Sequence, residues 1–284
     1  MLRWGRLSSV PAHIFYARHS DRKSRYKVAT ITAKHSEKFT LNSTSKRIAL
    51  VTGANKGIGF EIARQMAQSG ISVLMGAREP ERGMAAADPL SASGLDVAFI
   101  QIDLDDGASV AAAAAKIETE HGRLDILVNN AGIAPQGDGA PSVSSLDVVR
   151  RVFEANFFGT LAVTQAMLPL LRRSAAGRII NMSSGLGSLT LNGDPSNPFY
   201  EVRLIGYNAS KAALNMLTVQ LSAELRGSSV TVDSVCPGLT KTDLSGHRGE
   251  QSPAEAAITP VEFALMVEGK SSGKFVNAVG ELPW

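Results

Sequence analysis

The 284-residue chain has little sulfur chemistry and few histidines. Its single cysteine, Cys236, excludes an intramolecular disulfide and any metal site built from several thiolates, which indicates a reducing compartment. Only His121 and His247 lie beyond residue 46, so neither zinc ligation nor histidine-based catalysis is expected. The sequence predicts no metal site, and any acid–base chemistry must use other residue types.

Long apolar runs are also absent. The longest uncharged run within a helical pattern, residues 155–171, falls short of the ~20 apolar residues that a membrane span requires, and it contains Asn156, Gln165 and Pro169. We therefore expect a soluble protein without a membrane partner.

The basic charge of the chain lies at one end. Residues 1–46 carry ten Lys/Arg and two acidic residues, a net charge of +8, so the +3 of the whole chain leaves −5 for residues 47–284. The body has no basic patch with interleaved aromatics, so a nucleic-acid partner is not expected. The composition of residues 1–46 resembles that of an organelle transit peptide, but a disordered extension or a start site placed too far upstream explains it equally well. We predict a basic, disordered extension and a cytoplasmic location, or a plastid or mitochondrial one if the extension is a transit peptide.

From residue 47 onward, short β-branched runs alternate with helical patterns, as in βαβ units with a parallel sheet. Nearly continuous apolar runs indicate strands covered on both faces. These predicted strands span residues 47–52, 71–76, 96–102, 124–130, 177–183, 229–235 and 274–279, and the predicted helices span 57–69, 105–120, 145–173 and 207–226. The predicted fold class is α/β: residues 47–284 form a single Rossmann-type doubly wound domain with a mostly parallel seven-stranded sheet flanked by helices.

A glycine-rich turn, "TGANKGIG" at residues 52–59, follows the first predicted strand. Gly53, Gly57 and Gly59 permit a sharp turn and a close approach to a pyrophosphate, while the next helix directs its first amides at the anion. A purely structural turn is the alternative. The position between a strand and a helix favours dinucleotide binding.

Two cations point to the choice of dinucleotide. Arg78 stands after the second strand, where proteins that use NAD commonly place a carboxylate, and Lys56 lies within the glycine turn. Both suit a 2′-phosphate, so we predict NADP(H) rather than NAD(H), although Arg78 as a solvated surface charge remains an alternative. Asp103 is interpreted equally well as an adenine contact or as the cap of the next helix.

The stretch "YNASK" places Tyr207 and Lys211 on one face of a predicted helix. A tyrosine in water has a pKa of about 10 and transfers protons poorly at neutral pH. A fixed cation nearby favours the phenolate, so we predict that Lys211 lowers the pKa of Tyr207. An ordinary helix start with a solvated lysine is the alternative.

Six motifs occur in order: "TGANKGIG", "NNAG" (129–132), "FEANFFG" (153–159), "IINMSS" (179–184), "YNASK" and "PGLTKT" (237–242). Together they resemble the short-chain dehydrogenase/reductase family over residues 46–284. Lys56, Arg78 and the closing "GKFVNAVGELPW" make the chain most similar to NADPH-dependent carbonyl reductases.

The resemblance implies roles for four residues. Tyr207 would exchange a proton with the substrate oxygen, Lys211 would tune Tyr207 and hold the nicotinamide ribose, and Ser184 would polarise the carbonyl. Asn156 would support a water that links Lys211 to solvent, although a buried amide that satisfies helix backbone is an alternative. The implied cofactor contacts are Gly53, Asn55, Lys56, Gly57, Ile58, Gly59, Arg78, Asp103, Leu104, Asn130, Ala131, Gly132, Tyr207, Lys211, Pro237, Gly238, Thr240 and Thr242.

The chain departs from many relatives in the 22 residues between Ser184 and Tyr207. This longer segment predicts an extra loop beside the active site, which makes the usual tetramer doubtful and leaves monomer or homo-oligomer undecided. Residues 239–258 are predicted to form a mobile lid that, with the loop, sets substrate choice.

The predicted function is hydride transfer from NADPH to the carbonyl of a small aldehyde or ketone. A 3-oxoacyl reductase or an alcohol dehydrogenase would use the same residues. A non-catalytic NADP(H)-sensing regulator is disfavoured, because such proteins often lose the tyrosine or the lysine and both are present here.

Overall fold

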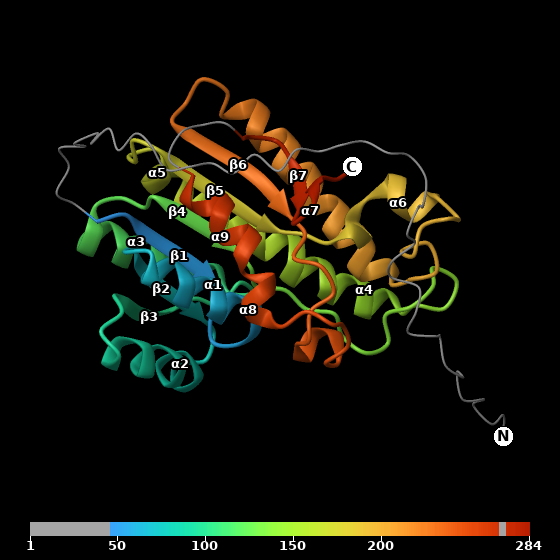
Figure 1. The fold of residues 1–284 in the computed structure, drawn as a ribbon, viewed down its shortest axis with the longest axis horizontal. Helices are drawn as coiled ribbons and strands as arrows, with labels where there is room; N and C mark the ends of the chain where they lie inside the picture. The colour runs from blue at the N-terminus through green and yellow to red at the C-terminus, as the bar shows by residue number, and fades with distance from the viewer. Residues whose placement is uncertain (1–45, 267–270) are drawn as a thin grey trace, which may run out of the picture. The chain divides into compact units, whose positions relative to one another are not determined.

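The computed structural model describes residues 46–266 and 271–284. Within them one sheet runs in the order β3-β2-β1-β4-β5-β6-β7-β8, parallel from β3 to β7 (Figure 1). The strands are β1 (Ile48–Thr52), β2 (Ser72–Ala77), β3 (Val97–Gln101), β4 (Ile126–Asn129), β5 (Gly177–Met182), β6 (Val230–Val235), β7 (Phe275–Asn277) and β8 (Gly280–Glu281). The α/β doubly wound fold is confirmed.

The prediction of seven strands is wrong by one. The run at 274–279 ends early because the Asn277 side chain accepts hydrogen bonds from the amides of Val279 and Gly280, and Gly280 has a φ of +141°. The chain turns back there as β8, antiparallel to β7. A two-residue strand is too short to leave an alternating pattern in the sequence.

The helices follow the predicted alternation, with additions. They are α1 (Gly57–Gln68), α2 (Pro80–Ala92), α3 (Gly107–His121), α4 (Leu146–Phe153), α5 (Gly159–Leu171), α6 (Leu189–Gly193), α7 (Ile205–Glu224), α8 (Pro253–Ala256) and α9 (Ile258–Leu265). The helix predicted at 145–173 is interrupted by a π-helical turn, Glu154–Phe158, between α4 and α5. Such turns are frequent at functional sites.

Two apolar layers hold the helices to the sheet. Val51 of β1, Ile62 of α1 and Val261 of α9 share one buried cluster, and α1 and α9 lie in front of the sheet in Figure 1. Leu50 of β1 and Val163 of α5 belong to a second cluster, together with residues of α3 and α7. Because both faces are covered, the strands are apolar at nearly every position, as their sequences indicated.

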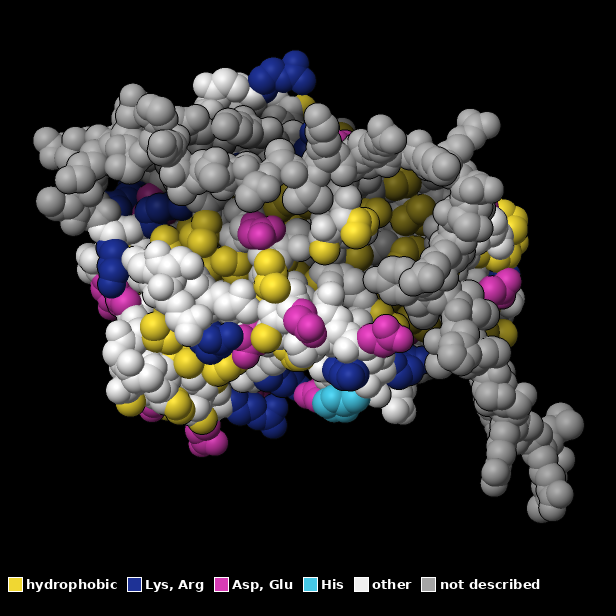
Figure 2. Space-filling model, viewed as in Figure 1, with side chains coloured by type: hydrophobic (Ala, Val, Ile, Leu, Met, Phe, Trp, Pro, Cys, Tyr) yellow, Lys and Arg dark blue, Asp and Glu magenta, His cyan; other side chains and the backbone are white. Residues whose placement is uncertain are grey.

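Charged side chains of both signs lie close together on the face shown in Figure 2. Exposed ion pairs of the described residues include Arg172–Glu224 and Lys274–Glu281. Such pairs contribute at most about 1 kcal/mol each, so the apolar layers dominate the stability of the fold.

The predicted N-terminal extension, residues 1–46, lies outside the described residues except for Lys46. Its nature, and the cellular location that depends on it, remain predictions. Within the described part of the chain, no helix combines the length and the apolar character needed to cross a membrane.

Candidate active site

The glycine turn after β1 is packed tightly against the start of the loop after β4. Gly53 and Gly57 have positive φ angles of 64° and 60°, which L side chains rarely adopt. A Cβ at Gly53 would lie 3.0 Å from Ala131 Cα, and one at Gly59 would collide with Asn130 Nδ2. The turn therefore requires glycine at position 53 for both conformation and space, at position 57 for conformation and at position 59 for space.

The turn is fastened to the loop after β4 by Thr52 and Asn130. Thr52 Oγ1 accepts hydrogen bonds from the amides of Asn130 (3.0 Å) and Ala131 (3.1 Å). In return, Asn130 Nδ2 donates to Thr52 O at 2.9 Å. Since β1 lies between β2 and β4, this junction is the topological switch point of the sheet, where ligands of such folds bind.

The first turn of α1 leaves its amides free for an anion. Lys56 at the N-cap makes no side-chain hydrogen bond to them, and the turn carries no acidic residue. Asn55 and Ile58 are half-buried on either side of Lys56. Unsatisfied amides at the positive end of a helix suit a pyrophosphate, so the residues present fit a dinucleotide.

The two predicted phosphate-binding cations are exposed and paired with nearby carboxylates. Lys56 Nζ lies 2.5 Å from Asp243 Oδ2, and Arg78 Nε lies 3.1 Å from Glu79 Oε1. Hydrogen bonding to Lys56 lowers the pKa of Asp243. Exposed pairs of this kind are weak, so both cations can exchange a carboxylate for a phosphate.

Asp103 is not the cap of the helix after β3. Asp106 caps α3 by accepting from the Ala108 amide, whereas Asp103 Oδ1 accepts from the Asp105 amide at 3.1 Å. The capping alternative for Asp103 is therefore wrong, and the adenine contact remains a prediction. The next residue, Leu104, packs against Gly159, where a Cβ would approach Leu104 Cβ to 2.7 Å.

Ser184, Tyr207 and Lys211 come together at the carboxyl end of β5. Lys211 is buried in α7, and its Nζ donates to Met182 O at 2.8 Å. It lies 5.7 Å from the centroid of the Tyr207 ring. Tyr207 hydrogen-bonds with the Ser184 side chain. The helical spacing of "YNASK" thus places the phenol and the amine side by side, as predicted.

Ser183 and Ser184 have different surroundings. Ser183 is buried, and its hydroxyl donates to Asn215 Oδ1 at 2.7 Å. Ser184 is half-buried and accepts from the Leu186 amide at 3.2 Å. Ser184 is thus the less buried of the two serines and the one whose side chain hydrogen-bonds with Tyr207, and its role toward the substrate stays a prediction.

Asn156 is buried in the π-helical turn and holds the loop after β4. Its Oδ1 accepts from the Ile133 amide at 2.7 Å, and its Nδ2 donates to Ile133 O and to Ser210 Oγ. A Cβ at Gly132 would lie 3.2 Å from Asn156 Oδ1 and 3.5 Å from Lys211 Nζ. Both predicted roles of Asn156 are thus compatible with its position: it satisfies backbone groups and lies close to Lys211.

Burial dominates the electrostatics of the tyrosine and the lysine. It raises the pKa of Tyr207 to about 12, an effect that Cys236 increases and the hydrogen bond with Ser184 opposes. Burial also lowers the pKa of Lys211 to about 8. For the protein's own groups, the expectation of a lowered pKa for Tyr207 is wrong, because desolvation by burial raises it. Tyr207 is a phenol, not a phenolate, at neutral pH.

The depressed pKa of Lys211 predicts a rise of stability with pH. An unfolded lysine keeps its proton up to about pH 10.4, whereas native Lys211 releases it near pH 8, so the unfolded state binds more protons in between. The raised pKa values of Cys236 and Tyr207 act in the opposite direction, above about pH 8.5 and about pH 10 respectively, and both groups are present in all the variants compared. We expect urea unfolding to show a larger gain in stability from about pH 7 to about pH 9.5 for the wild type than for Lys211→Met. The exposed control Lys116→Met should keep the full gain, and equal gains in all three proteins would contradict the burial of Lys211.

The segment after β6 contains Cys236 and Thr242. It lies against the Tyr207–Lys211 pair and against the glycine turn. Cys236 is buried, its Sγ accepts from the Gly185 amide at 3.1 Å, and burial raises the pKa of its thiol. A Cβ at Gly57 would lie 3.5 Å from Thr242 Cγ2, so Thr242 lies over the glycine turn. Nothing in the sequence signals that Cys236 borders Tyr207 and Lys211.

Local hydrogen bonds order residues 237–252, a segment that includes the first part of the predicted lid (239–258). Gln251 Nε2 donates to Pro237 O at 2.6 Å, and Thr240 Oγ1 donates to Gly238 O at 3.1 Å. Thr240 pairs with Gln251 in an isolated bridge. Mobility of the segment stays a prediction.

The long segment between Ser184 and Tyr207 forms a compact cover on α7. Asn192 of α6 accepts a hydrogen bond from Asn208 Nδ2 at 2.9 Å. Phe199 lies on Gly185, where a Cβ would collide with its ring. An aromatic ring is therefore fixed one residue away from Ser184, as expected for a loop that borders the active site.

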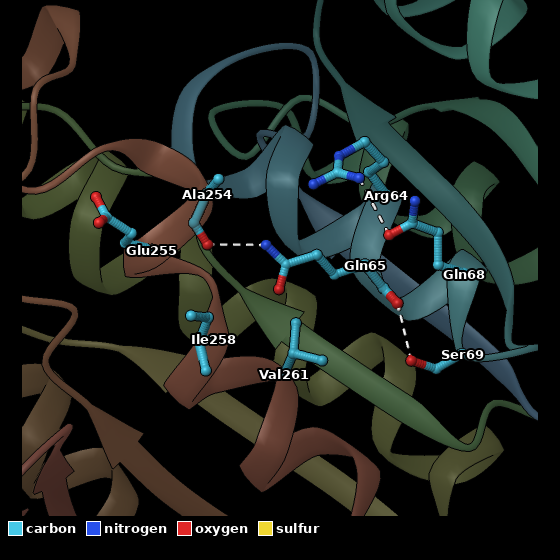
Figure 3. Close-up of a pocket in the computed structure, with 8 residues that line it drawn as sticks. All are labelled: Arg64, Gln65, Gln68, Ser69, Ala254, Glu255, Ile258 and Val261. Carbon is cyan, nitrogen blue, oxygen red and sulfur yellow. Dashed lines mark hydrogen bonds between the residues drawn. The ribbon is translucent and has the colours of Figure 1, made fainter.

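A groove of about 520 Å³ lies elsewhere, between α1 and the α8–α9 segment (Figure 3). Arg64, Gln65, Ile258 and Val261 line it, and Gln65 Nε2 donates to Ala254 O across it at 2.8 Å. None of the predicted site residues takes part. The candidate active site is thus the junction of the glycine turn with Ser184, Tyr207 and Lys211.

Comparison with known proteins identifies the family of the chain. The sequence model of the family described as short chain dehydrogenase matches residues 47–253. Carbonyl reductase (NADPH) 1 of Mus musculus is 35% identical over 283 residues, covering 85% of this chain and 100% of its own length. (-)-Isopiperitenone reductase of Mentha piperita is 33% identical and covers 81% of this chain and 96% of its own.

Among solved structures, NADPH-bound carbonyl reductase from chicken fatty liver superposes with a TM-score of 0.74 at 29% identity, covering 84% of this chain and 99% of its own. The fold and these matches define an oxidoreductase that acts on carbonyl or alcohol groups. The chain belongs to the short-chain dehydrogenase/reductase family, and it is similar to carbonyl reductases within that family.

Proposed function

We propose that the protein transfers a hydride from NADPH to the carbonyl carbon of a small aldehyde or ketone. The observation that carries the proposal is the meeting of Ser184, Tyr207 and Lys211 beside a glycine turn whose helix amides are uncapped. Relatives named as NADPH carbonyl reductases support the choice of reaction and of cofactor.

The cofactor supplies the hydride, and the protein's own groups manage the charge that develops on the substrate oxygen. Tyr207 and Ser184, already hydrogen-bonded to each other, are the two donors for that oxygen. With a pKa of about 12, Tyr207 is protonated over the working range and has a proton to give. Transfer of that proton yields the neutral alcohol.

Lys211 and Asn156 complete the proton pathway in this proposal. The pKa of Lys211, about 8, lies close to neutral pH. Lys211 would bind the nicotinamide ribose and return a proton to Tyr207. Both N–H groups of the Asn156 amide already have acceptors, but one lone pair of Oδ1 remains near Lys211. That oxygen can accept a hydrogen bond from a water that connects Lys211 with solvent.

The direct test is the loss of NADPH absorbance with a panel of carbonyl compounds. Turnover of small aromatic ketones and aldehydes is expected, with weaker use of acyl thioesters. The reverse order would favour a 3-oxoacyl reductase, and faster oxidation of alcohols with NADP⁺ would favour an alcohol dehydrogenase. Binding of NADPH without consumption would favour a regulator and overturn the proposal.

The cofactor preference rests on Lys56 and Arg78. Each cation is expected to make charge-assisted hydrogen bonds with the 2′-phosphate, and loss of such a bond costs about 1.5–3 kcal/mol, or about 10- to 100-fold. We therefore expect Lys56→Ala and Arg78→Ala each to lower kcat/KM for NADPH by at least about 10-fold, while kcat/KM for NADH changes less than about 2-fold.

Lys116→Ala is the matched control for this experiment, since Lys116 is an exposed cation in a comparable ion pair with Glu120 on α3. It should leave both cofactors unaffected. Equal losses with NADPH and NADH in the Lys56 and Arg78 variants would show that neither cation reads the 2′-phosphate.

A further inference from the structure

A carboxylate from a distant part of the chain binds the first turn of α7, the helix that carries Tyr207 and Lys211. Asp138 lies in the loop after β4 and is half-buried. Its Oδ1 accepts from the Gly206 amide at 2.9 Å, and its Oδ2 accepts from the Tyr207 amide at 2.8 Å. Oδ1 also accepts from its neighbour's amide at Gly139 and, at 3.2 Å, from the Ser144 hydroxyl.

Helix α7 needs this carboxylate because it lacks a cap of its own. Leu204 occupies the N-cap position and has no side chain that can accept a hydrogen bond. The first amides of a helix have no partner within the helix, and a negative charge there also interacts favourably with the helix dipole. Asp138 therefore serves as a cap that is separated from Tyr207 by 69 positions in the sequence.

The loop that carries Asp138 contacts the glycine turn, Asn156 and the start of α7. It begins at Asn130, which is fastened to the glycine turn, and continues through Ile133, which is bonded to Asn156. It ends at Asp138 on the backbone of Tyr207. In addition, the Ile205 amide donates to Gly139 O at 2.9 Å. The start of α7 is thus fixed by one continuous segment relative to the cofactor side of the site.

We propose that Asp138 is a positioning residue for Tyr207, whose carboxylate sets the place of the phenol relative to Ser184 and Lys211. The inference rests on the proposed function, because it assigns Asp138 an effect that passes through the proton donor. Misplacement of a catalytic group by about 1 Å can lower a rate about 100-fold. An amide cannot replace the carboxylate: its Nδ2 would face a backbone N–H on one side.

A double-mutant cycle between Asp138 and Tyr207 tests the proposal. Asp138→Asn is expected to lower kcat for carbonyl reduction by about 10-fold or more when Tyr207 is present. In the Tyr207→Phe background the same substitution should lower kcat less than about 2-fold, since the group that it positions is already gone. NADPH binding, followed by cofactor fluorescence, gives the concentration of folded enzyme for each variant and should change less than about 2-fold in affinity.

Gly206→Ala provides a second variant that keeps the carboxylate. Gly206 lies in α7 without a positive φ, and alanine has the higher helix propensity. Its Cβ would lie 3.1 Å from Asp138 Oδ2 and 3.3 Å from Asp138 Cγ, so the carboxylate must shift by a few tenths of an ångström. We expect a fall in kcat of about 3-fold or more that also disappears in the Tyr207→Phe background.

Ser144→Ala is the matched control, because it removes one hydrogen bond to Asp138 and leaves both bonds to α7 in place. It should change kcat less than about 2-fold. Equal falls of kcat in both Tyr207 backgrounds would mean that Asp138 acts only through general stability and would overturn the proposal. So would a loss of less than about 2-fold for Asp138→Asn with Tyr207 present. Failure of the proposed function is distinguishable, since the wild type would then bind NADPH without consuming it and the cycle would have no kcat to compare.

Discussion

Replacement of Tyr207 by phenylalanine is expected to lower the rate of carbonyl reduction about 100-fold or more, the scale of a lost general acid. Phenylalanine keeps the ring that packs beside Lys211 and removes only the hydroxyl that meets Ser184. Ser184 then remains as a single donor for the developing oxyanion, with no group to deliver a proton. Because the ring is retained, NADPH affinity should change little.

Steady-state kinetics and NADPH titration of the purified variant measure both quantities. Tyr200→Phe is the matched control: this tyrosine lies in the loop before α7, and the Arg203 guanidinium lies 5.5 Å from its ring centroid. We expect it to retain turnover within about 2-fold. Near-normal turnover of Tyr207→Phe would remove the phenol from the mechanism.

Removal of the Asp233 carboxylate is expected to destabilise the fold by about 3–5 kcal/mol. Arg178 of β5 and Asp233 of β6 form an ion pair, 3.6 Å apart, and both side chains are almost fully buried. Burial raises the pKa of Asp233 and lowers that of Arg178, while each charge opposes the shift of its partner. Asp233→Ala leaves a guanidinium in the protein interior without its counter-charge.

The comparison with a double replacement makes this prediction specific. Because desolvation is the largest effect on both pKa values, the pair is costly to bury, and an apolar pair of similar volume should be tolerated far better. Urea unfolding of Asp233→Ala, and of Arg178→Met combined with Asp233→Leu, measures the difference. A double variant as unstable as the single one would contradict the account. In that case the hydrogen bonds from Arg178 to Phe263 O would be the stabilising element.

Most of the sheet and the outline of the site could be predicted from the sequence. Buried parallel strands are apolar on both faces, so their runs are visible without any knowledge of tertiary contacts. The glycine turn was recognisable because a positive φ at Gly53 and Gly57 demands a residue without a side chain. The spacing of Tyr207 and Lys211 placed them on one helix face, and the structure confirms that they are neighbours.

Features that depend on distant segments escaped prediction. Helix α2 contains Pro89 and presents few buried residues, so its pattern is weak, and the π-helical turn at Asn156 is invisible in a continuous helical periodicity. The capping of α7 by Asp138 joins residues 68 and 69 positions apart. The direction of the Tyr207 pKa shift was missed for the same reason, because desolvation is set by the packed neighbours and not by the adjacent lysine alone.

Lys56 and Arg78 are exposed whereas Lys211 is buried, so dissolved salt affects these two parts of the site differently. Mobile ions screen charges at the water boundary over about 10 Å at 0.1 M salt, but they scarcely reach Lys211 in the interior. The proposed discrimination between NADPH and NADH should therefore fade as ionic strength rises, while the proposed proton transfer at Tyr207 is unaffected. Evolutionary changes confined to Lys56 and Arg78 could therefore alter the proposed coenzyme preference and leave Ser184, Tyr207 and Lys211 unchanged.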